Sequence, residues 1–106
     1  MSRKTREQTE GGVALAEKTK TKRPPLYKVI LHNDDYTPME FVIAILETVF
    51  HKDHTEAVSL MYTVHFKGKA VVGLYPRGVA ESKVAKVLTL AREKGHPLLC
   101  TMEPDA

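Results

Sequence analysis

The sequence is short of the residues that would place it among disulfide-rich, secreted or membrane-spanning proteins. It has one cysteine, Cys100, and no tryptophan in 106 residues, so a disulfide framework is excluded. No apolar run approaches the roughly 18 residues of a membrane span, and residues 1–25 are too polar for a secretory signal. We therefore expect a cytoplasmic protein, with Cys100 as a small buried side chain in a reducing compartment.

Positive charge is scarce where nucleic-acid binding would need it. The formal net charge is +3, but residues 1–25 hold seven basic and three acidic residues, whereas residues 26–106 hold nine basic and ten acidic ones. The remainder of the chain has no basic stripe for phosphates, so we expect no nucleic-acid partner. Residues 1–25 also have too few apolar side chains to offset their ordering entropy. They predict a flexible, basic, disordered N-terminal extension.

Residues 26–106 have the length and composition of a single small domain. Periodicity predicts strands at 26–31, 69–75 and 97–102 and helices at 38–50, 54–66 and 79–94. The fold class is therefore α/β, more narrowly α+β, in the order β-α-α-β-α-β. Three such short strands cannot form two packed sheets, so we expect one three-stranded antiparallel sheet with three helices covering a face.

Local signals set the expected ends of these helices. Thr37 and Glu40 have capping-box spacing, with Pro38 as the first helical residue. Asp53 is positioned to cap the second helix, and Gly68 to end it. Residues 76–78 are expected to form a turn ahead of the third helix, which Gly95 ends.

The first predicted helix is apolar over a wider arc than a surface helix requires. The arc covers roughly 200°, against about 100° for a helix that meets one core. Its apolar residues are Met39, Phe41, Val42, Ile43, Ile45, Leu46, Val49 and Phe50. Either this helix is buried between several neighbours, or part of it faces a ligand.

A pocket between the first two helices is the ligand-binding alternative. Met61, Val64 and His65 share one side of the second helix at i, i+3 and i+4, and a polar loop leads directly into Met39. If the helices pack, the apolar walls are Met39, Val42, Met61 and Val64, and the polar rim is Asn33, Asp34, Asp35 and His65. Such a pocket suits a ligand with an apolar body and a cationic head.

Catalytic and metal-binding chemistry is not favoured. Adjacent aspartates lack the geometry of an acid–base pair, and no serine or cysteine has a recognisable base and orienting partner. His51 and His54 have a possible metal spacing but no evident further ligands. We expect neither enzymatic activity nor a metal or cofactor. A small metal-dependent hydrolase built on the histidines and aspartates is the alternative.

Three separated segments carry a pattern that folding alone does not require: residues 29–42 (VILHNDDYTPMEFV), 79–84 (VAESKV) and 96–103 (HPLLCTME). Together they resemble the ClpS family, the bacterial N-degron adaptors of the ATP-dependent Clp protease. The resemblance covers residues 26–103 in register. It implies a non-enzymatic ClpS-like core domain. We expect a monomer, because nothing in the sequence indicates an obligate dimer, and we expect no membrane partner and no cofactor. The function that it implies is to bind proteins beginning with Leu, Phe, Tyr or Trp and deliver them to a ClpA-type AAA+ unfoldase.

The resemblance also assigns roles to individual residues. Asn33, Asp34 and His65 would hold the α-amino group and first peptide unit, while Asp35 and Thr37 order the loop. The pocket for the side chain would be lined by Met39, Val42, Met61, Val64 and Leu98. Met39 is expected to reject β-branched Val and Ile.

Delivery to the unfoldase would use Glu81 and Lys83 at the start of the third helix. The preceding residues 76–78 depart from the family pattern, because they lack a capping hydroxyl and an acidic residue at Gly78. A rival interpretation keeps the fold but changes the function, to a ribosomal-stalk-like interaction domain without an N-degron pocket. The stalk domain lacks the Asn-Asp-Asp-Tyr-Thr-Pro-Met segment, so its presence here favours the adaptor.

Overall fold

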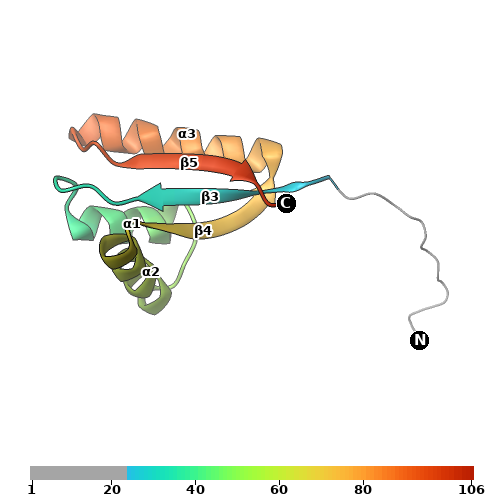
Figure 1. Cartoon of the computed structure of the whole chain (residues 1–106). Coiled ribbons are helices and arrows are strands. Elements are labelled where there is room, and N and C mark those ends of the chain that lie inside the picture. Colours follow the sequence, from blue (N-terminus) through green and yellow to red (C-terminus); the bar gives the residue numbers. More distant parts are fainter. Residues whose placement is uncertain (1–23) are drawn as a thin grey trace.

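The structure, a computed structural model, describes residues 24–106, so residues 1–23 of the expected extension lie outside the described part (Figure 1). The elements are β3 (Leu26–His32), α1 (Met39–Thr48), α2 (His54–Lys67), β4 (Lys69–Pro76), α3 (Arg77–Lys94) and β5 (Leu99–Pro104). The predicted order β-α-α-β-α-β is confirmed. Within residues 24–106, no helix is long and apolar enough to cross a membrane.

The three strands form one antiparallel sheet in which β3 lies between β4 and β5, as Figure 1 shows. Leu31 pairs with Ala70 on one side and Cys100 on the other, and all three side chains are buried beneath the helices. The opposite face of the sheet is open, and on it Leu74 of β4 is 48% exposed. The expected sheet, with helices on one face, is therefore correct.

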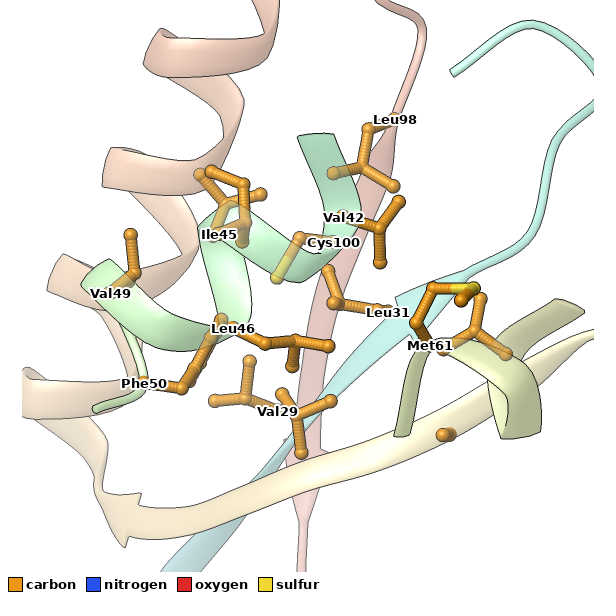
Figure 2. Close-up of a cluster of buried hydrophobic side chains, with 14 of the residues drawn as sticks. Val29, Leu31, Val42, Ile45, Leu46, Val49, Phe50, Met61, Leu98 and Cys100 are labelled. Carbon is orange, nitrogen blue, oxygen red and sulfur yellow. The ribbon is translucent and has the colours of Figure 1, made fainter. Parts of the chain in front are cut away.

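Helix α1 is surrounded by the other elements of the core. Its Leu46 is fully buried and is directed toward Val29 of β3, while Val42 lies between β5 and α2 (Figure 2). This burial on several sides explains most of the wide apolar arc. At its N-terminal end, however, Met39 stays 42% exposed. The core therefore accounts for the buried part of the arc, and Met39 lies outside it.

Helix α2 begins and ends at the residues that its sequence signals predicted. Asp53 accepts a hydrogen bond of 2.8 Å from the backbone N–H of Glu56. Gly68 has a φ of 91°, which a side chain would strain, and its N–H donates to the carbonyl of Val64. The buried residues of α2 are Ala57, Met61 and Val64. These caps fix the length and the rotation of the helix against the core.

The start of α1 differs from the prediction. The first helical residue is Met39, and Pro38 is the N-cap with an extended ψ of 144°. No side chain caps this end, so the predicted capping box is wrong. Thr37 lies one residue before this N-cap, and its hydroxyl donates to Asp34 at 2.7 Å.

Other element boundaries also move. Helix α1 ends at Thr48, two residues before the expected end, and β5 continues to Pro104. The turn expected at residues 76–78 is not formed, because α3 begins at Arg77, directly after β4. Arg77 and Glu81 form an i, i+4 ion pair of 3.3 Å that supports this first turn. The last strand starts at Leu99, since Leu99 is already opposite His32, where β3 ends.

Candidate functional site

A cavity of about 360 Å³ lies between the loop that follows β3, the start of α1 and one side of α2. Its lining residues are Asn33, Asp34, Asp35, Tyr36, Thr37, Pro38, Met39, Val42, Met61, Val64 and His65. The loop and the two helices meet here because the core faces of α1 and α2 pack together beside β3. A cavity of this volume is at the small end of ligand pockets.

The base of the cavity is apolar and rigid. Val42, Met61 and Val64 are at most 7% exposed and belong to the core of the domain. Met39 forms a wall nearer to solvent, at the first residue of α1. Buried side chains of this kind do not repack freely. The cavity therefore has a fixed shape at its base and one adaptable methionine closer to its opening.

The loop over the cavity is held in place by Asp34. One carboxylate oxygen accepts backbone N–H groups from Tyr36 at 2.8 Å and Thr37 at 2.7 Å, and the other accepts the Thr37 hydroxyl. The loop is tied to the end of α2 as well, because the N–H of Asn33 donates to the carbonyl of Gly68 at 2.9 Å. These bonds position one wall of the cavity against the other.

The same hydrogen bonds set the charge of Asp34. Partial burial alone would raise the pKa of this carboxyl, but the hydrogen bonds from Thr37 and Tyr36, together with the nearby His96, outweigh it and lower the pKa. Asp34 is therefore a carboxylate at neutral pH. The cavity has a fixed negative charge beside its opening, which favours a cationic ligand group there.

Three further polar residues line the cavity with side chains open to solvent. Asn33, Asp35 and His65 are all exposed. Asp34 and Thr37 are hydrogen-bonded to each other within the loop. An exposed amide, carboxylate and imidazole offer both donors and acceptors at the cavity opening. Together with the apolar base, they suit a ligand with an apolar side chain and a polar, positively charged end.

Comparison with known proteins identifies the family. The model of the family described as "ATP-dependent Clp protease adaptor protein ClpS" matches residues 22–101. The chain belongs to the ClpS family. The ClpS adapter protein of Roseobacter denitrificans is 51% identical over 105 residues, covering 99% of this chain and 93% of that protein. That of Shewanella piezotolerans is 56% identical over 82 residues, or 77% of this chain and 80% of the relative.

A solved ClpS structure has the same fold. Agrobacterium tumefaciens ClpS2 bound to L-phenylalaninamide is 46% identical, with a TM-score of 0.76. The match covers 78% of this chain and all of that one. The ligand named in that structure is an amino acid amide, and so has an apolar side chain beside a free amino group. The ClpS fold thus agrees with the predicted fold class, and the ribosomal-stalk alternative is not favoured.

One residue expected in the ClpS pocket lies elsewhere. Leu98 is 4% exposed and packs in the core beside Val42, without lining the cavity (Figure 2). Its buried position still supports the wall that Val42 forms. Conversely, Tyr36 and Pro38 line the cavity and were not expected there. Their place in the sequence, between Asp35 and Met39, was the available signal.

The two residues expected to contact the unfoldase have different surroundings. Glu81 is exposed on α3 and pairs with Arg77. Lys83 is half-buried, and its ammonium donates to the carbonyl of Val49 at 2.7 Å and lies 5.8 and 5.2 Å from the ring centres of Phe50 and Tyr75. Val49 is the C-cap of α1, so Lys83 satisfies a helix end that would otherwise lack a partner.

Beside Lys83 the structure has a second cavity, of about 590 Å³. It is lined by Thr48, Val49, His51, Gly78, Val79, Ser82, Lys83 and Lys86. Glu81 is not among these residues. The cavity lies between the end of α1 and the start of α3, whereas the first cavity uses the start of α1 and α2. These two cavities are therefore separate concave surfaces.

The histidines and aspartates considered for metal binding are dispersed. His54 is within 2.7 Å of a carboxylate oxygen of Glu47, and Asp53 caps α2. In the described part of the ClpS chain, no three His, Cys, Asp or Glu side chains gather as a metal site would require. The only thiol in the sequence, Cys100, is 2% exposed, and burial raises its pKa to about 12. The expectation of a buried cysteine is confirmed.

Proposed function

We propose that this protein is an N-degron adaptor: it binds proteins whose free first residue is Leu, Phe, Tyr or Trp and delivers them to a ClpA-type unfoldase of the Clp protease. The observation that carries the proposal is the 360 Å³ cavity, with a buried apolar base and a polar opening that includes the fixed carboxylate of Asp34. Membership of the ClpS family supports it. So does the L-phenylalaninamide bound by the Agrobacterium relative.

The chemistry of a protein N-terminus matches the two parts of the cavity. The α-amino group has a pKa of about 7.7 to 8.0, so it is mostly cationic near neutral pH. Asn33, Asp34 and His65 would bind this ammonium and the first peptide unit, with Asp35 and Thr37 contributing at the loop. The side chain would enter the apolar base, between Val42, Met61 and Val64. An internal residue has no ammonium and therefore gains only the apolar contacts.

Met39 is proposed as the residue that selects among apolar side chains. It stands nearer to solvent than the buried base, where the Cβ of a bound first residue would pass. A branch at Cβ, as in Val or Ile, would meet the methionine, whereas Leu and the aromatic residues branch further along. This position accounts for the expected rejection of β-branched residues. Leu98 would act only by supporting Val42.

Delivery is proposed to use the start of α3. Glu81 is exposed there, and the second cavity provides an adjoining concave surface with apolar Val79 and basic Lys86. We expect Glu81→Lys to leave binding of N-terminal peptides unchanged and to weaken the complex with the unfoldase. Lys83 is less suitable for this test, because its ammonium is already bound to α1. Equal unfoldase affinity of the Glu81 variant and the parent protein would place the contact elsewhere.

The adaptor would catalyse no reaction. It would act as a monomer in the bacterial cytoplasm, with the protease that it serves. Its partners would be substrate proteins and the unfoldase, with no nucleic acid, membrane or cofactor involved. The division into a flexible extension over residues 1–25 and a core over 26–106 is part of the same proposal, because hand-off requires a segment that the unfoldase can engage.

The experiment that tests the proposal is a fluorescence-polarisation titration with peptides that differ only in their first residue. Free Leu and Phe are expected to bind, and free Val to bind weakly. Nα-acetylation of Leu removes the ammonium and its charge-assisted hydrogen bonds, so we expect affinity to fall by about ten- to a hundredfold. His65→Ala should weaken binding, whereas Leu74→Ala, on the open face of the sheet, should not. Equal binding of the free and acetylated peptides would refute the adaptor function.

A further inference from the structure

Helix α2 carries an exposed row of three aromatic rings next to the cavity, here termed the aromatic ridge (Tyr62, His65 and Phe66). The rings of Tyr62 and Phe66 are stacked, with centres 5.8 Å apart and planes at 10°. The ring of His65 meets Phe66 edge to face at 4.9 Å. Of these residues only His65 lines the cavity. The ridge thus continues from the edge of the cavity onto the outside of the helix.

The ridge is not part of the core. The buried face of α2 consists of Ala57, Met61 and Val64, whereas Tyr62 is 45% exposed and Phe66 is 75% exposed. A stacked i, i+4 pair contributes only a little to helix stability. Stacking on Tyr62 also covers only one face of the Phe66 ring. The domain therefore keeps a large aromatic surface in water immediately beside its proposed binding site.

A bound peptide would bring its second side chain to this surface. Consecutive Cα atoms are about 3.8 Å apart, so the second residue lies within one residue's reach of the cavity opening. Side chains alternate in direction along an extended chain. When the first side chain points into the cavity, the second therefore remains at the level of the opening, where His65 and Phe66 stand.

We propose that the aromatic ridge is a second specificity site, which binds an aromatic side chain at the second position of the substrate through the Phe66 ring. The proposal rests on the N-degron function proposed above and adds to it. Aromatic pairs contribute beyond their buried area when their rings stack or meet edge to face. The ridge provides a ring face on Phe66 with the rings of Tyr62 and His65 beside it. Substrates would then be ranked by their first two residues, not by the first alone.

The test compares two peptides that differ only at the second position, Leu-Phe and Leu-Ala, in the same polarisation assay. We expect Leu-Phe to bind about three- to tenfold more tightly than Leu-Ala. Phe66→Ala should abolish the difference in affinity between the two peptides. Phe66→Tyr keeps the ring and should preserve the difference. Leu74→Ala, which removes an exposed apolar side chain from the open face of the sheet, should also preserve it.

The possible outcomes distinguish failure of the ridge proposal from failure of the adaptor function. Equal affinity for the two peptides in the parent protein would overturn the ridge proposal and leave the adaptor function intact. A preference for Leu-Phe that survives Phe66→Ala would also overturn it. If neither peptide bound, the adaptor function would fail and the ridge proposal with it. A thermal melt of each variant excludes misfolding as the cause, and the exposure of Phe66 predicts an unchanged midpoint.

Discussion

Removing the carboxylate of Asp34 is expected to destabilise the domain as well as weaken peptide binding. Its three hydrogen bonds join a charged acceptor to the loop, and each such bond contributes about 1.5–3 kcal/mol when well shielded. Asp34 is only half-buried, and water can replace it at the exposed N–H of Tyr36. We therefore expect Asp34→Ala to cost about 1–2 kcal/mol in total, or a midpoint lowered by roughly 4–15 °C for a domain of this size.

The pH dependence of this effect identifies its cause. The pKa of Asp34 is lower in the folded domain than in the unfolded chain, so its stabilisation is complete above the unfolded pKa of about 3.9 and is lost as the pH falls through the folded pKa. The difference in unfolding free energy between the parent protein and Asp34→Asn should persist from about pH 7 to about 5 and shrink below about 4. Thermal or urea unfolding measures it. A difference that did not change toward acid pH would show that the carboxylate charge does not hold the loop.

Three other outcomes follow from the structure. Met39→Ala should raise the affinity for peptides beginning with Val by about tenfold, with little change for peptides beginning with Leu. Competition binding measures both affinities, and an unchanged ratio between Leu and Val peptides would show that Met39 does not select between them. Lys83→Met should lower the unfolding free energy by about 1 kcal/mol, because the carbonyl of Val49 loses its donor; an unaltered urea midpoint would contradict that. Gly68→Ala should lower the unfolding free energy by about 1 kcal/mol through the φ of 91° alone, since a Cβ there meets nothing within 4 Å. Gly78→Ala, within α3, should raise the unfolding free energy by up to about 1 kcal/mol. Thermal melts in which both midpoints moved in the same direction would refute this backbone argument.

Much of the fold was predictable because its signals are local. Asp53 caps α2 and Gly68 ends it, and each does so through one hydrogen bond to a residue three or four positions away. Alternation and periodicity identified the three strands and three helices, and their small number left one economical sheet. The apolar base of the cavity followed from the same periodicity, since Val42, Met61 and Val64 lie on the core faces of their helices.

The structural roles of residues that depend on tertiary packing could not be predicted from the sequence. Thr37 has the spacing of a helix cap, but α1 begins one residue later than expected, and the hydroxyl donates to Asp34 in the loop. The residues after Pro76 look like a turn, yet the path of β4 leads straight into α3. Leu98 is next to a strand and apolar, and only the position of α1 decides that it packs against Val42 and not in the cavity.

The buried thiol of Cys100 can serve as a probe of local unfolding in this protein. It is the single sulfhydryl group in the chain, it lies in the central sheet beside Leu31, and its raised pKa leaves it almost entirely protonated at neutral pH. A thiol reagent therefore acts on it only when the sheet separates from the helices. The rate of alkylation reports the free energy of that separation without any label on the protein. A ligand held between α1 and α2 slows the reaction in proportion to its occupancy, so peptides can be compared by mass spectrometry alone.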